Sequence, residues 1–240
     1  MSKNRKILLM IVLLITILAA SIITAAGSNP WFLLGKNSLK YEKDRDVIIA
    51  KVGNTKITKE DIEMQILFNK FQKEVLNRKL SELQNSNLNI NSFLSVDVSR
   101  KDILNKLIDE AILYEEAQRQ GLNVTYDDAK KFMENTRYIM NAIAKGELKC
   151  ENQKEAMEEI YNFKAYIKGL GMSEDEYWNE IIVYYQKILS IGNLKNKIIS
   201  AMSEKDKNDI NKVNEFFEKY KNELRKKYKI EILDGKFLQQ

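Results

Sequence analysis

Residues 47–58 read VIIAKVGNTKIT, and this stretch decides the fold class. A run rich in β-branched residues over 47–52 is followed by Gly53-Asn54, a dipeptide typical of hairpin turns. Near the other end of the chain, residues 228–233 alternate in the way that predicts a strand. A strand of this length is unstable alone, so we expect the N- and C-terminal strands to pair as a small antiparallel β element.

The chain between these two strands is predicted to be helical. Thr58 with Asp61 forms a capping box at a helix start, and Ser99 with Asp102 repeats the pattern. Gly121 suits a left-handed C-terminal cap. Apolar spacing and end signals predict helices over about 58–83, 99–120, 125–143, 153–168, 173–188 and 210–224. The expected fold class is therefore mainly α, with one helical domain over 46–235 closed by the β element and a tail over 236–240.

The composition argues against most enzyme classes. The 240 residues include no His, which is the commonest general base and metal ligand, and one Cys, which cannot form an internal disulfide or a thiolate zinc site. Adjacent acids such as Asp127-Asp128 and Glu158-Glu159 point about 100° apart on a helix and do not converge on one atom. We therefore predict no catalytic residues, no cofactor and no metal site.

The N-terminal segment predicts a membrane anchor. Residues 7–26 carry no charge and follow Lys3, Arg5 and Lys6, so a cytoplasmic n-region over 1–6 precedes a signal anchor over 7–26 that crosses the lipid bilayer. The alternative is a signal peptide cleaved after the small residues 24–26. The anchor places the rest of the chain outside the cytoplasm, after a tether over 27–45. Because most of the net charge of +5 lies in this segment, no nucleic-acid partner is predicted.

Two stretches resemble a known family. IAKVGNTKITKEDIE (49–63) and KDILNKLIDEAILYEEAQRQGLNVTYDDAKK (101–131) are similar to the N-terminal module of the SurA/PrsA-type extracytoplasmic folding factors. The tail ELRKKYKIEIL (223–233) resembles the helix and strand that close that module. The motif of its second helix and the following turn corresponds here to Leu104, Leu107, Ile108, Asp109, Glu110, Leu113, Glu116, Ala117, Gly121, Val124 and Thr125.

The resemblance implies a chaperone-like module that holds unfolded or partly folded exported polypeptides. Full members carry a parvulin module whose site uses His, whereas this chain has no His and reads as helical over 130–206. Prolyl isomerase activity is therefore not expected. The alternative function is a structural or adaptor module for one dedicated cell-envelope partner, and an unrecognised enzyme comes third.

The first predicted helix is apolar on two sides. One stripe contains Ile62, Ile66, Leu76, Leu80 and Leu83, and the opposite side contains Met64, Phe68, Phe71 and Val75. A helix of this kind is either sandwiched inside the domain or presents one side to a partner. Met and aromatic side chains adapt to varied partners. The second side therefore supplies the candidate client-binding residues, with the sandwiched arrangement as the alternative.

Overall fold

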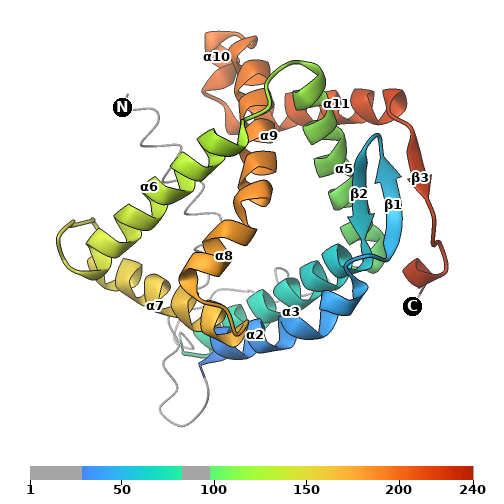
Figure 1. Cartoon of the computed structure of the whole chain (residues 1–240). Helices are drawn as coiled ribbons and strands as arrows, with labels where there is room; N and C mark the ends of the chain where they lie inside the picture. The colour runs from blue at the N-terminus through green and yellow to red at the C-terminus, as the bar shows by residue number, and fades with distance from the viewer. Residues whose placement is uncertain (1–28, 83–97, 240) are drawn as a thin grey trace. The chain divides into compact units, whose positions relative to one another are not determined.

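The structure is a computed structural model that describes residues 29–82 and 98–239 (Figure 1). The predicted n-region and the predicted anchor over 7–26 lie outside these residues, as does Leu83. Within the described residues, no helix is both long enough and apolar enough to cross a bilayer. The chain packs as two compact units: unit 1 contains 29–40, 67–82 and 137–174, and unit 2 contains 41–66, 98–136 and 175–239. The single domain expected over 46–235 stays a prediction, because separate packing does not show whether the units fold independently.

Unit 2 contains a three-stranded antiparallel sheet in the order β2-β1-β3. Its strands are β1 (Ile48–Val52), β2 (Thr55–Thr58) and β3 (Ile230–Ile232). Gly53 occupies the turn between β1 and β2 with φ of 57°, a conformation that favours glycine. Ala50 lies opposite Ile232 in the β1–β3 register, which confirms that the N- and C-terminal strands pair. β3 is shorter than the predicted strand.

Helices surround this sheet and make the chain mainly helical. α5 (Arg100–Arg119), α9 (Ile182–Ser200) and α11 (Ile210–Lys227) pack with the sheet around a core that includes Ile49, Val52, Ile103, Ile112, Leu194 and Leu224. Shorter elements complete unit 2: η1 (Leu39–Asp44), which begins in unit 1, α8 (Glu174–Glu180), α10 (Glu204–Lys207) and η2 (Phe237–Gln239). The helix predicted over 173–188 is therefore divided at Ile181 into α8 and α9 and extends further than expected.

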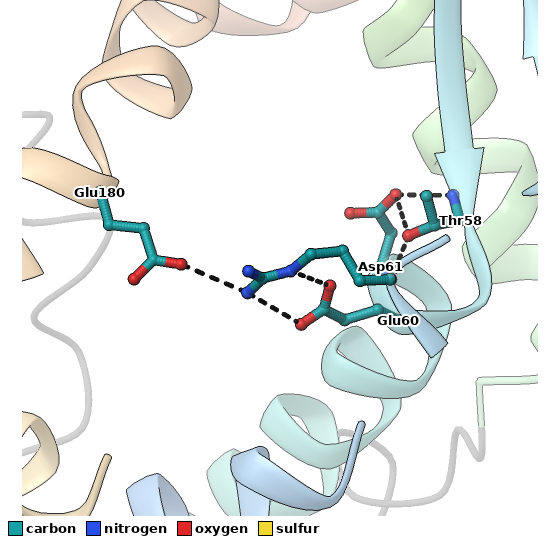
Figure 2. A network of polar contacts seen from close by, with 5 residues as sticks. Thr58, Glu60, Asp61 and Glu180 are labelled. Carbon is teal, nitrogen blue, oxygen red and sulfur yellow. Dashed lines mark hydrogen bonds and ion pairs between the residues drawn. The ribbon is translucent and has the colours of Figure 1, made fainter. Parts of the chain in front are cut away.

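The predicted start signals are present as hydrogen bonds. At the start of α3 (Lys59–Glu82), Asp61 accepts from the Thr58 amide at 2.7 Å, and the Asp61 amide donates to the Thr58 hydroxyl at 3.2 Å (Figure 2). Beside this capping box, Arg45 joins Glu60 at 3.1 Å and Glu180 at 3.2 Å. Capping signals also start α5 and α6 (Tyr126–Ala144), because side-chain oxygens satisfy their first amides.

Unit 1 is built from α2 (Pro30–Ser38), α7 (Gln153–Gly169) and the adjoining parts of α3 and α6. The range predicted as a tether over 27–45 therefore contains packed, regular structure. Asn29 caps α2 by accepting from the Trp31 amide at 2.8 Å, and Pro30 occupies the first helical position, where its missing amide hydrogen costs nothing.

Candidate functional site

An apolar cluster in unit 1 contains most of the residues predicted to bind clients. We name it the α2–α3 cluster. Its buried members are Leu34, Phe71 and Val75, and the half-buried members around them are Trp31, Leu67, Phe68 and Tyr166. The Trp31 and Phe71 rings meet edge to face with centroids 4.8 Å apart, and the Phe68 and Tyr166 rings lie 5.9 Å apart. The cluster therefore has a closed centre and an aromatic rim.

The four predicted residues occupy different environments. Phe71 and Val75 are only 8% and 7% exposed, while Phe68 is half-buried at the rim. Met64 is half-buried in unit 2, outside the cluster. Burial of Phe71 and Val75 against α2 matches the sandwiched arrangement for those two side chains. Client binding by the set stays a prediction.

The opposite stripe of α3 is only partly a core stripe. Ile62 is fully buried in the core of unit 2, and Ile66 packs against that core. Leu76 was expected to be buried with them, but its side chain is 40% exposed. The side chain of Leu80 lies outside the part of the chain that is described. A helical wheel therefore grouped residues that belong to two units with separate cores.

Two glycines hold α2 directly against α7. A Cβ atom placed on Gly35 would lie 2.2 Å from the Tyr166 carbonyl oxygen, and one on Gly169 would lie 2.1 Å from the Phe32 carbonyl oxygen. Both distances are far below van der Waals contact, so the two backbones touch where a side chain would otherwise separate them. This close approach fixes Trp31 and Leu34 in the α2–α3 cluster. The sequence analysis did not include Trp31 and Leu34 among the candidate client-binding residues, although Asn29-Pro30 signals the start of the helix that contains them.

Further apolar side chains of unit 1 are open to solvent. Tyr138 and Tyr161 are 70% and 60% exposed, and Met157 is 46% exposed. Met157 and Tyr161 are four residues apart on α7, so they share one face of that helix. Exposed apolar side chains of this kind offer contact area to a polypeptide partner, although isolated ones are ordinary on protein surfaces.

Unit 2 contains a buried carboxylate that is fully engaged in structural hydrogen bonds. Glu116 is 2% exposed and accepts from Arg119 at 2.6 Å, from the Tyr228 hydroxyl at 2.8 Å and from the Tyr220 hydroxyl at 3.3 Å. The Arg119 hydrogen bond, assisted by Gln120 and Tyr228, lowers the pKa of Glu116 to about 2, although burial acts in the opposite direction. Glu116 therefore stays ionised and connects α5 to α11 and to Tyr228, the residue that caps the end of α11.

Asp109 has a similar role about two turns earlier on α5. Its carboxylate accepts from the Arg225 side chain and lies 3.4 Å from the Lys221 ammonium. Arg225 also donates to the Asn105 carbonyl oxygen at 2.8 Å. Asp109 and Glu116 are both motif positions of the family resemblance, and in this chain both join α5 to α11. The geometry gives them a structural role.

No other chemistry converges in the described ranges. Across 29–82 and 98–239, no group of three or more His, Cys, Asp or Glu side chains is placed to hold a metal ion. Cys150 is a half-buried free thiol whose backbone amide donates to the Gln153 side chain at 3.1 Å.

Comparison with known proteins identifies the family. A family model described as SurA-like N-terminal domain matches residues 1–182, which include the β1–β2 hairpin and helices α2, α3, α5, α6, α7 and α8. No curated protein and no solved structure matches the chain. The SurA N-terminal domain is a chaperone module, which indicates a chaperone-like folding-helper role. With the match covering well over half of its length, the chain belongs to the SurA-like N-terminal domain family.

Proposed function

We propose that this protein is a membrane-anchored extracytoplasmic holdase that binds non-native exported polypeptides and does not catalyse prolyl isomerisation. The observation that carries the proposal is the family match over residues 1–182. The uncharged segment 7–26 behind three basic residues supports the anchor and the location of the remaining chain outside the cytoplasm. The lack of His supports the absence of parvulin-type catalysis.

The rim of the α2–α3 cluster is the surface we assign to client contact. Trp31, Phe68 and Tyr166 are half-buried aromatic residues, so each ring has one part packed and another part accessible. Aromatic side chains carry much of the energy of polypeptide interfaces. The buried centre, Phe71 and Val75, holds the rim in position. The assignment thus keeps Phe68 as a contact residue and gives Phe71 and Val75 a supporting role.

A client-panel aggregation assay tests the proposed function. Residues 28–240, verified as folded by circular dichroism, are added to several unrelated proteins as these aggregate after dilution from denaturant. We expect light scattering to decrease for most clients in a concentration-dependent manner. If the aggregation of no client were suppressed, the result would contradict the holdase function. Tight stoichiometric binding to one envelope protein, without general suppression, would indicate the adaptor function instead.

A refolding assay tests the absence of catalysis. The slow, proline-limited phase of a substrate protein is followed with and without residues 28–240. We expect the rate constant to be unchanged, because the chain contains no His to act in a parvulin-type site. Acceleration that persists after removal of contaminating isomerases would refute this part of the proposal.

A further inference from the structure

β3 lies at the edge of the described sheet. The sheet order is β2-β1-β3, so β1 lies on one side of β3 and no other described strand lies on its second side (Figure 1). The Leu233 amide donates to the Ile49 carbonyl oxygen at 2.8 Å. In an antiparallel pair, residues alternate between facing the neighbouring strand and facing away. The backbone groups of Glu231 and Leu233 therefore face β1, and those of Ile230 and Ile232 face outward.

The edge presents exposed apolar side chains next to charged ones. Ile232 and Leu233 are each 53% exposed, although they belong to a strand or directly follow it. Exposed edge strands are templates for pairing with another chain, and proteins usually protect them with short length, charged side chains, proline or bulges. β3 has three residues and carries the charges of Lys229 and Glu231 at its edge, so only a partner with complementary charges can pair with it. β3 contains neither proline nor a bulge in its β1 register. Among residues 29–82 and 98–239, no strand pairs with this edge.

We propose that β3 pairs antiparallel with β3 of a second copy of this chain, which joins two three-stranded sheets into one. The charge pattern selects the register. When Ile230 lies opposite the partner's Ile230, Lys229 lies opposite the partner's Glu231, and the reverse pair forms by symmetry. Opposite charges in cross-strand pairs are stabilising. The next register that keeps the outward-facing backbone groups of Ile230 and Ile232 toward the partner is shifted by two residues. It would place Glu231 opposite the partner's Glu231, and like charges in that position are destabilising.

The side chains concerned are free to exchange partners. Lys229 and Glu231 form an ion pair within one chain at 2.5 Å, so both lie on the same face of the strand. Their side chains are 83% and 41% exposed, so the second copy's charges can reach them. Replacing this exposed local pair by two pairs across the new strand boundary retains every charge contact.

The backbone bonds of this register limit the strength of the dimer. The Ile230 amide donates to the partner's Ile230 carbonyl oxygen, and the Ile232 amide donates to the partner's Tyr228 carbonyl oxygen. Symmetry doubles both bonds. The Tyr228 amide already donates to the Leu224 carbonyl oxygen at 3.1 Å, so it adds no hydrogen bond to the partner strand. Because the paired segment is short, we expect a weak dimer whose population depends on protein concentration.

A charge-reversal experiment on the full chain tests the register. Sedimentation equilibrium in density-matched detergent at low salt is expected to show a monomer–dimer equilibrium. Glu231→Lys and Lys229→Glu should each weaken dimerisation at least about tenfold, because two cross-strand pairs become like-charged. An equimolar mixture of the two variants should dimerise as well as the original chain, because every pair across the boundary again has opposite charges. Lys130→Glu, at an exposed position of α6, is the control for the change of net charge.

Several results would overturn the proposal. The proposal is wrong if the original chain stays monomeric at all concentrations. It is also wrong if the mixture of Glu231→Lys and Lys229→Glu dimerises no better than each variant alone. Equal weakening by Lys130→Glu would assign the effect to net charge. Circular dichroism on each variant confirms that the fold is retained.

Cross-linking in the membrane provides an independent test of the register. In a Cys150→Ser background, Ile230→Cys places two thiols at a hydrogen-bonded pair, where Cα atoms are about 5.5 Å apart and a disulfide can form. Oxidation should give a covalent dimer. Ile232→Cys, which lies opposite the partner's Tyr228, should not. Efficient cross-linking of Ile232→Cys without Ile230→Cys would contradict the register.

Discussion

Replacing Gly35 with Ala should release α2 from α7. The added Cβ atom would lie 2.2 Å from the Tyr166 carbonyl oxygen and 3.0 Å from the Leu170 amide nitrogen. Both neighbours are backbone atoms, so no flexible side chain can move aside. Since ordinary contacts begin at about 3.4 Å, α2 must shift by roughly 1 Å or more. The shift would loosen the packing of Trp31 and Leu34 in the α2–α3 cluster.

Two opposing effects decide the size of the change. Ala is favoured over Gly inside a helix by up to about 1 kcal/mol. Overpacking of a close contact costs about 1–3 kcal/mol, and each large apolar side chain that loses its burial costs roughly 1.5–3 kcal/mol. Leu34, Phe71 and Val75 all depend on the position of α2. We therefore expect Gly35→Ala to lower the free energy of unfolding by about 2 kcal/mol, or to detach α2 altogether.

Urea unfolding followed by circular dichroism measures this change, and a red shift of Trp fluorescence reports exposure of Trp31. Gly192→Ala is the matched control, because Gly192 lies inside α9 and an added Cβ atom would meet nothing within 4 Å. This control should stabilise the chain by about 0.5–1 kcal/mol through helix propensity alone. If Gly35→Ala raised the unfolding midpoint as much as Gly192→Ala does, the reasoning about the glycine contact would be refuted.

Three further predictions concern burial, titration and processing. Phe71→Ser should lower the free energy of unfolding by about 3–5 kcal/mol, because the ring is buried. Phe68→Ser should keep the fold and reduce the suppression of client aggregation. If both variants kept the urea midpoint and the aggregation suppression of the original chain, this side of α3 would have no part in client binding. Because the pKa of Glu116 falls from 4.5 to about 2 on folding, its contribution of roughly 3 kcal/mol is complete above pH 4.5 and is lost as the pH falls toward 2. The difference in urea midpoint between the original chain and Glu116→Gln should therefore shrink over that range, and a constant difference would contradict the titration. Intact mass of the membrane-extracted protein should include residues 1–26; a product that starts at Gly27 would show cleavage.

Local signals in the sequence were sufficient for most of the elements. The turn at Gly53-Asn54, the capping boxes at Thr58 and Ser99 and the glycine at 121 each act within about four residues, so they could be interpreted without knowing the fold. The alternation over 228–233 predicted a strand, but finding the partner of that strand required one further step. An isolated strand needs a partner, and the chain offered only one at its other end. Pairing of β1 with β3 confirms this inference.

The position of the cluster was decided by contacts between distant segments. Gly35 and Gly169 meet only in the folded chain, and neither residue carries a local sign of the contact. As a result, the helix over 30–38 was interpreted as a tether, and the packing of Phe71 against Trp31 was not anticipated.

The sequence by itself determined where the β1–β2 turn lies and where α3, α5 and α6 begin, because hydrogen bonding near a helix start or a turn depends on a few adjacent residues. It also determined which side chains of α3 are apolar. Only the tertiary structure decided which of them are buried, because burial depends on what packs against each face. Phe71 is covered by α2, Ile62 by the core of unit 2, and Leu76 remains exposed on the same helix.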